Sequence, residues 1–193
     1  MRPENKAERE AQIAEAAYAV LAEKGFAGLS MLAVAKRAKA SNETLYRWYG
    51  DKTGLFRALI LRNAEQVTRR LEALPDGGAG RAVLEALGAA LLDMLLSERA
   101  VALNRAAAAD ASDTLGAVLA EAGRGTVFPR LLAVFERLCA AGEVSGPPEV
   151  TAALWVDLLV GDWQVRLVTG AMRMPDADAR AARVRRAADG VLI

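Results

Sequence analysis

Histidine is absent from the 193-residue sequence, and cysteine occurs once, as Cys139. The missing histidine removes the side chain that most often binds a metal or moves a proton near neutral pH. A single cysteine can form no internal disulfide and offers no metal cluster. The sequence also lacks a phosphate-binding glycine motif and a nucleophile beside an evident base. We therefore expect no enzyme activity, no metal site and no cofactor.

Long apolar runs are missing too. Charged residues interrupt every apolar segment before it reaches the roughly 20 residues needed to cross a bilayer, and no apolar run of a signal peptide follows residues 1–6. We expect a cytoplasmic protein with no membrane partner. The net charge is only +1, but residues 1–62 carry 11 Lys and Arg against 7 Asp and Glu, and residues 63–193 carry 14 against 17. The basic end is the candidate surface for a polyanion.

Alternating apolar and polar residues, the pattern of a strand, are also absent over any useful length, whereas apolar residues recur every three to four positions. This pattern predicts an all-α fold of about nine to ten helices. A stretch rich in glycine and proline at 75–80 divides the chain, and we expect an N-terminal domain at 7–67 and a C-terminal helical bundle at 68–193. The helices are predicted at 6–24, 31–38, 42–49, 51–74, 81–97, 99–109, 112–123, 126–141, 148–172 and 177–191.

Two serines mark the starts of the second and third predicted helices. The hydroxyls of Ser30 and Ser41 can each accept a hydrogen bond from a free backbone amide of the helix that follows, and Asp51 can do the same for the fourth helix. Only about three residues separate the second and third helices, so they must cross steeply. The segment from Ser30 to Tyr49 is therefore predicted to form a helix-turn-helix.

Residues 30–56, SMLAVAKRAKASNETLYRWYGDKTGLF, closely resemble the helix-turn-helix core of the TetR family of transcriptional regulators. The matching positions are Ser30, Met31, Val34, Ala35, Ala38, Ala40, Ser41, Thr44, Leu45, Tyr46, Tyr49, Lys52 and Leu55. The detailed resemblance covers about the first third of the chain. It implies a DNA-binding regulator, by default a repressor, whose larger domain dimerises and senses a small molecule.

Helix geometry assigns the candidate DNA contacts. Leu45 and Tyr49 are four residues apart and share the face that packs inward, so other side chains of the third helix point toward a major groove. Arg47 can pair with guanine, Asn42 with adenine and Glu43 with the cytosine amino group, and Thr44 or Trp48 can touch a thymine methyl. Phosphate contacts are expected near the helix starts. The residues in that set are Ser30, Lys39, Ser41, Tyr46 and Lys52, and the resemblance implies the phosphate role most directly for Tyr46 and Lys52.

Two positions depart from the family pattern. Lys39 stands in the turn where glycine is usual, and a left-handed backbone there would cost roughly 1 kcal/mol. We expect either a reshaped turn or a phosphate contact that offsets this cost. Glu43 stands where a small residue is common, and its charge suits the start of a helix but repels phosphates. Glu43 is thus expected to restrict the DNA sequences that are tolerated.

The predicted helix at 148–172 is apolar on nearly all sides, which indicates burial against both its own domain and a second subunit. By resemblance, the last two helices pair with their copies in a four-helix interface, which would set two recognition helices about 34–36 Å apart. An ordinary intramolecular core is the alternative. The residues assigned to the dimer interface are Val156, Leu159, Val160, Trp163, Leu167, Val184 and Ala188.

A small-molecule pocket is expected in the larger domain, also by resemblance. Polar residues within its apolar helices are the candidate ligand contacts, namely Asp93, Asn104, Arg105, Asp157 and Gln164. Their mixed charges select no ligand chemistry, so the effector is unknown. Binding of the effector is expected to move the fourth helix and so release the operator. The competing hypothesis keeps the DNA-binding head but makes the chain an architectural or protein-partnered factor with no small ligand.

Overall fold

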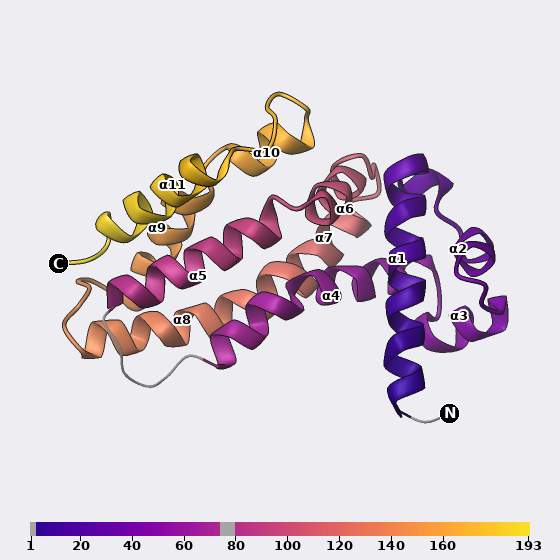
Figure 1. Ribbon diagram of the computed structural model, residues 1–193, viewed down its shortest axis with the longest axis horizontal. Coiled ribbons are helices and arrows are strands. Elements are labelled where there is room, and N and C mark those ends of the chain that lie inside the picture. Colours follow the sequence, from indigo (N-terminus) through magenta and orange to yellow (C-terminus); the bar gives the residue numbers. More distant parts are fainter. Residues whose placement is uncertain (1–2, 74–79) are drawn as a thin grey trace. The chain divides into compact units, whose positions relative to one another are not determined.

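The computed structural model describes residues 3–73 and 80–193, and within them the chain is built from helices (Figure 1). The all-α prediction is confirmed. The predicted break at 75–80 lies outside the described residues except for Gly80, where α5 begins. The elements are α1 (Pro3–Gly28), α2 (Met31–Arg37), α3 (Asn42–Tyr49), α4 (Lys52–Glu72), α5 (Gly80–Leu95), α6 (Glu98–Ala108), α7 (Thr114–Leu119), a π-helical turn (Ala120–Arg124), α8 (Gly125–Ala140), α9 (Pro148–Val160), α10 (Trp163–Val168) and α11 (Ala177–Asp189).

Contacts divide the chain into two units. The first takes in the chain up to Arg62 together with Ala102–Ala122, and the second takes in Asn63–Val101 together with Gly123–Ile193. Helices α4 and α6 each contribute to both units. The domain boundary expected between residues 67 and 68 stays a prediction, since shared contacts do not establish which segments fold alone.

The first unit has its own apolar core. Ile13 of α1, Val34 of α2, Leu45 of α3 and Phe56 of α4 are each 0% exposed and belong to one cluster. The segment 102–122 adds further buried apolar side chains to this same cluster. The buried hydroxyl of Tyr18 donates a 2.5 Å hydrogen bond to the carbonyl oxygen of Leu59, which ties α1 to α4. These contacts fix the scaffold on which α2 and α3 are held.

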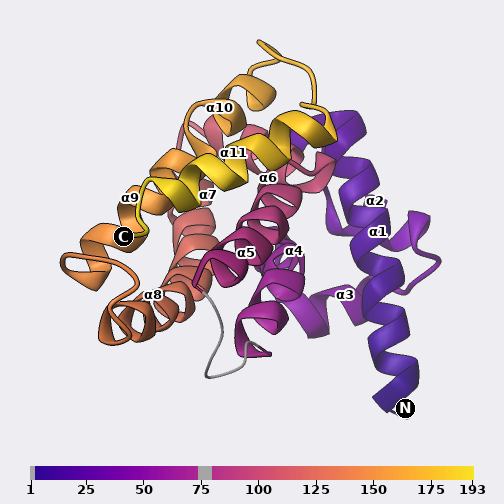
Figure 2. The same cartoon turned by 60° about the vertical axis from the view of Figure 1, so that its left-hand side comes forward.

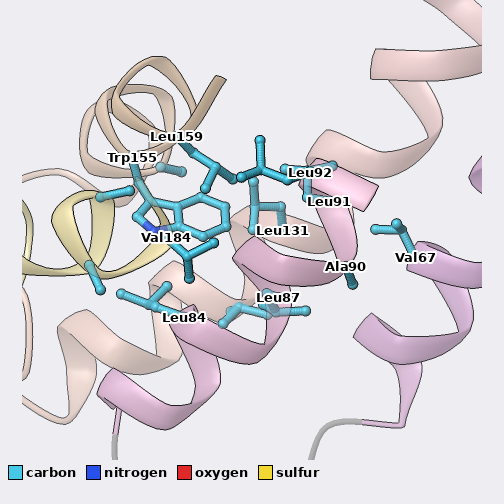
Figure 3. Packing of buried hydrophobic residues seen from close by; sticks show 14 of the residues in the cluster. Val67, Leu84, Leu87, Ala90, Leu91, Leu92, Leu131, Trp155, Leu159 and Val184 are labelled. Carbon is cyan, nitrogen blue, oxygen red and sulfur yellow. The ribbon is translucent and has the colours of Figure 1, made fainter. Parts of the chain in front are cut away.

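The second unit is organised around Trp155, which is 0% exposed (Figure 3). Its indole ring lies 5.8 Å from the ring of Phe135, centroid to centroid, and Leu159 and Val184 pack in the same cluster. Gly88 of α5 allows this close approach, because a Cβ there would lie 3.1 Å from Val184 and 3.4 Å from the indole. Helix α11 packs against both α5 and α9, as Figure 2 shows. A large aromatic side chain therefore joins four helices.

The prediction of a single helix at 148–172 is wrong. The structure has α9 and α10 instead, separated at Gly161, whose φ of 49° and ψ of −130° lie outside the helical region. Arg183 of α11 supports the break, because its Nε donates hydrogen bonds to the carbonyl oxygens of Leu158 (3.0 Å) and Leu159 (3.1 Å). Its guanidinium also stacks over the Trp163 ring at 4.7 Å. Glycine suits this position because side chains rarely adopt such a positive φ, and a Cβ would also displace the Nη2 end of the Arg183 side chain.

The break changes the surface that a second subunit can reach. Four residues assigned to the dimer interface, Leu159, Leu167, Val184 and Ala188, are buried within the subunit's own core. The other three, Val156, Val160 and Trp163, are partly buried and pack against that core. The stripe is therefore largely intramolecular core, which was the alternative interpretation of the apolar pattern.

No helix among the described residues is both long and apolar enough to cross a membrane.

Candidate nucleic-acid interface

Serine caps begin both helices of the predicted helix-turn-helix. The Ser30 hydroxyl oxygen accepts a 3.1 Å hydrogen bond from the Ala33 amide, and the Ser41 hydroxyl oxygen accepts a 3.0 Å bond from the Thr44 amide. Each bond satisfies one of the free amides at a helix start. Asp51 caps α4 in the same way, through a 2.7 Å bond from the Gly54 amide. The three predicted caps are thus confirmed, and they fix where α2, α3 and α4 begin.

The turn between α2 and α3 adopts a left-handed conformation at Lys39, with φ of 50°. The Lys39 amide donates to the Lys36 carbonyl (3.3 Å), and the Ala40 amide donates to the Ala35 carbonyl (2.9 Å). This pair of bonds is the motif that ends many helices, and glycine usually occupies its left-handed position. The turn is not reshaped to suit a lysine. The strain expected from the sequence, about 1 kcal/mol, is therefore present.

Helix α3 presents a polar outer face. Leu45 is 0% exposed and anchors the helix to the core, whereas Asn42, Glu43 and Arg47 are exposed as predicted. Tyr46 adds an exposed phenol, with 51% of its surface accessible. The outer face thus carries an amide, a carboxylate, a guanidinium and a phenol within six consecutive residues, all with hydrogen-bonding groups suited to base edges or phosphates.

The two residues predicted to touch a thymine methyl, Thr44 and Trp48, make contacts within the protein. Trp48 is partly buried against the core, meets the Tyr49 ring edge-to-face at 6.4 Å, and has the Lys6 amine 5.8 Å from its ring. It lies three residues after Leu45, so it shares the edge of the inward face. The Thr44 hydroxyl is 2.8 Å from the Ser41 hydroxyl within the cap. Neither side chain belongs to the exposed set on α3.

The predicted phosphate contacts are mostly exposed side chains. Ser30, Lys39, Ser41 and Tyr46 are exposed. Lys52 is partly buried, and its amine lies 3.9 Å above the centre of the Phe26 ring, a favourable cation–π position.

Burial raises the pKa of the Tyr49 hydroxyl, and the nearby carboxylate of Glu10 raises it further. Tyr49 is therefore a neutral packing residue at the back of α3.

The five candidate ligand contacts are divided between the two units. Asn104 and Arg105 belong to the first unit, while Asp93, Asp157 and Gln164 belong to the second. Asp93 is exposed and forms an ion pair with Arg180, whose Nη1 lies 2.6 Å from the Asp93 Oδ1. Asp157 is exposed as well. The Gln164 amide donates to the Leu95 carbonyl at 3.2 Å. The assignment of these residues to an effector pocket stays a prediction.

An ion pair that the sequence did not suggest joins α4 to the π-helical turn within the first unit. The two terminal nitrogens of Arg57 donate to the two carboxylate oxygens of Glu121, at 2.9 and 2.7 Å. The residues are 64 positions apart, and no local pattern links them. The nearest signal was the helical periodicity of the segment around Glu121, which gave no indication of its partner.

This ion pair predicts a specific response to acid. The hydrogen bonds from Arg57 lower the pKa of the Glu121 carboxyl, so the pair stabilises the fold above the ordinary glutamate pKa and is lost as pH falls through the lowered value. Both side chains are substantially exposed, at 39% and 70%, so the effect is small. We expect the free energy of unfolding of Glu121→Gln to depend less steeply on pH than that of the parent below about pH 5. In an Arg57→Gln background, Glu121→Gln should leave that dependence unchanged; an equal flattening there would contradict the assignment.

The geometry defines an all-α protein with a helix-turn-helix of the DNA-binding class near its N-terminus. A model described as bacterial regulatory proteins of the tetR family matches residues 13–59, and one described as the C-terminal domain of AefR-like transcriptional repressors matches residues 82–192. The second match alone covers more than half of the chain. The chain therefore belongs to the TetR family of bacterial regulatory proteins, as the helix-turn-helix motif predicted.

Individual relatives agree with this assignment. The chain is 32% identical over 106 residues to the uncharacterized HTH-type transcriptional regulator YdeS of Bacillus subtilis (strain 168), a match over 45% of this chain and about half, 52%, of the relative. A TetR transcriptional regulator from Agrobacterium tumefaciens is 27% identical, with a TM-score of 0.77 over 100% of this chain and 96% of its own. The flavonoid-responsive regulator FrrA, at 24% identity, has the same fold, with a TM-score of 0.69 over 95% of each chain.

Proposed function

We propose that this protein is a sequence-specific DNA-binding repressor of transcription, which binds a palindromic operator as a dimer and is released by a small molecule. The exposed polar face of α3 carries this proposal. Asn42, Glu43 and Arg47 present the hydrogen-bonding groups that distinguish base pairs in a major groove. The excess of Lys and Arg over residues 1–62 supports attraction to DNA. The repressor role is supported by the match of residues 82–192 to the C-terminal domain of AefR-like transcriptional repressors.

Each exposed side chain has a natural base partner. Arg47 is suited to a bidentate bond with guanine, Asn42 to one with adenine, and Glu43 to the amino group of cytosine. Lys39, Ser30 and Tyr46 lie exposed around this face and are suited to phosphates, which would set the register of α3 on the duplex. Glu43 also repels nearby phosphates, so it narrows the range of sequences that bind.

A second copy of the chain is the partner that the outer side of α9 and α10 fits. Val150 (62% exposed) and Leu154 (46%) are four residues apart on α9, and Val165 (56%) stands on α10. Residues at this spacing lie together on one helix face, opposite the buried Thr151, Trp155 and Leu159. A twofold contact through this surface would give the complex two recognition helices, as a palindromic operator requires.

Release by an effector is supported by the family and by the fold. FrrA, which shares the fold, is by name a flavonoid-responsive regulator. A ligand held in the larger unit would favour a state with lower affinity for DNA, and a coupling of about 1–3 kcal/mol would change that affinity about 5- to 150-fold. A screen of metabolites against the preformed complex with DNA tests this part. Unchanged affinity throughout the screen would favour a regulator without a small ligand.

Selection of bound duplexes from a random pool tests the DNA-reading face directly. We expect an inverted repeat whose half-sites are about 10 base pairs apart, centre to centre. Arg47→Ala should then weaken binding about 5- to 150-fold for each half-site and relax the preference at one position of each half-site. Arg173→Ala, which removes an exposed arginine in the other unit, is the matched control and should bind as the parent does.

Three outcomes would contradict the proposal. Absence of any salt-sensitive binding to duplex DNA would remove DNA recognition altogether. Binding without sequence preference would favour an architectural role. Equal losses in the Arg47 and Arg173 variants would indicate an effect of net charge and not of base contact.

A further inference from the structure

Arg9 of α1 makes an unexpected contact with the turn of the helix-turn-helix. Its Nη2 donates a hydrogen bond to the carbonyl oxygen of Lys39, the left-handed residue between α2 and α3. Its Nη1 donates a 2.7 Å bond to the amide oxygen of Gln12, one turn further along α1. The two bonds hold the planar guanidinium at both ends, so its position against the turn is defined.

The contact falls where the backbone is strained. A lysine at φ of 50° is less favourable than glycine would be, because its Cβ crowds the following carbonyl. Rotation out of this conformation would break the Ala40–Ala35 hydrogen bond and shift Ser41, which caps α3. A charged hydrogen bond to the Lys39 carbonyl opposes that rotation. The direction of α3 relative to α2 therefore depends on how firmly this one residue is held.

We propose that Arg9 is a positioning residue for DNA reading: it holds the Lys39 turn in its left-handed state and thereby orients α3. The bond from Arg9 offsets the strain of having a lysine at a position that glycine usually occupies. Arg9 acts on the backbone of its own chain and not on a phosphate. The orientation of α3 is a property of the free protein, and only its consequence for affinity rests on the proposed function.

Amide hydrogen exchange of the free protein tests the first part. In Arg9→Ala, the amides of Ala40 and Thr44 should exchange about three- to tenfold faster, as expected for loss of one hydrogen bond that is exposed to solvent. Buried amides of α1 and α4 should keep their rates, whereas a merely structural loss of stability would accelerate them as well. In a Lys39→Gly background the same substitution should have little effect, because glycine adopts the left-handed state without strain.

Salt dependence of DNA binding separates positioning from direct contact. For a duplex selected by the parent protein, Arg9→Ala should weaken binding about three- to tenfold and leave the slope of log affinity against log salt unchanged. A phosphate contact by Arg9 would instead reduce that slope by about 0.9 for each copy of the chain in the complex. Lys24→Ala removes an exposed cation from the other end of α1 and is the control for net charge.

Unchanged exchange at Ala40 and Thr44 in Arg9→Ala would overturn the proposal. So would an equal effect of Arg9→Ala with Lys39 and with glycine at that position, or a fall in the salt slope. If the parent protein binds no duplex, the proposed function fails, and the exchange measurement still decides whether Arg9 holds the turn.

Discussion

Replacing Trp155 by alanine is expected to lower the free energy of unfolding by about 3–5 kcal/mol, the cost of removing a large aromatic side chain from a closed core. Trp155 is 0% exposed and packs with Phe135, Leu159 and Val184, so the side chains around it belong to α8, α9 and α11. Gly88 brings α5 equally close to the indole. The space left behind cannot be filled without moving whole helices. Urea unfolding followed by circular dichroism measures the change.

Trp155→Phe is the matched control. It keeps an aromatic ring in the core and removes the indole Nε1, which is buried and has no hydrogen-bond partner among the described residues. Loss of that donor costs no hydrogen bond and relieves an unsatisfied polar atom. We expect a loss of less than about 1.5 kcal/mol, as for other swaps that nearly conserve volume. A similar loss in both variants, or a loss below about 1 kcal/mol for alanine, would mean that the second unit does not depend on this packing.

The first unit could be predicted closely because its signals are local. Ser30, Ser41 and Asp51 each bond to an amide only three residues away, so a cap can be recognised in the sequence itself. The inward position of Leu45 follows from helical spacing in the same way. The conformation at Lys39 was left open between a left-handed turn, as the glycine usual at this position implies, and a reshaped one, and the structure has the left-handed form.

The parts that were missed depend on residues far apart in the chain. Helical periodicity runs unbroken through Gly161, and the break there is supported by Arg183, which supplies hydrogen bonds to the freed carbonyl groups from another helix. Arg9 and Lys39 are 30 residues apart, and Arg57 and Glu121 are 64 apart. The joining of 102–122 to the first unit has the same character. A single sequence contains no pattern that pairs such positions.

The candidate site shows the same division at the level of side chains. Spacing from Leu45 accounts for the outward positions of Glu43 and Arg47, which lie on the other side of the helix. Asn42, three residues before Leu45, is exposed because it stands at the start of α3. Trp48 stands at the border of the two faces, where burial depends on what packs nearby. It is partly buried, in contact with the Tyr49 ring and with the Lys6 amine of α1, and its assignment as a thymine contact stays a prediction. Residues at such borders need the tertiary structure to be assigned.

A charge placed on the outer side of α9 should separate the proposed dimer and abolish most operator binding. Leu154 is 46% exposed, so Leu154→Glu should change the stability of the subunit by no more than about 0.5 kcal/mol. Two copies of a buried glutamate would face each other across a twofold contact, which is strongly unfavourable. Loss of the second recognition helix removes an avidity of about 10²- to 10⁴-fold. Analytical ultracentrifugation and binding to the selected inverted repeat measure the two effects.

Leu61→Glu is the matched control, because Leu61 is a leucine of similar exposure, 42%, that belongs to the first unit and not to the proposed contact. It should remain a dimer with the affinity of the parent. If Leu154→Glu also sediments as a dimer, the outer side of α9 is not the contact, and the exposed Val165 of α10 becomes the next position to test. If Leu154→Glu is a monomer that still binds the full repeat as tightly as the parent, the operator is read by one head at a time. The palindromic model depends on the two losses occurring together, since the surface of α9 influences DNA only through the second copy it recruits.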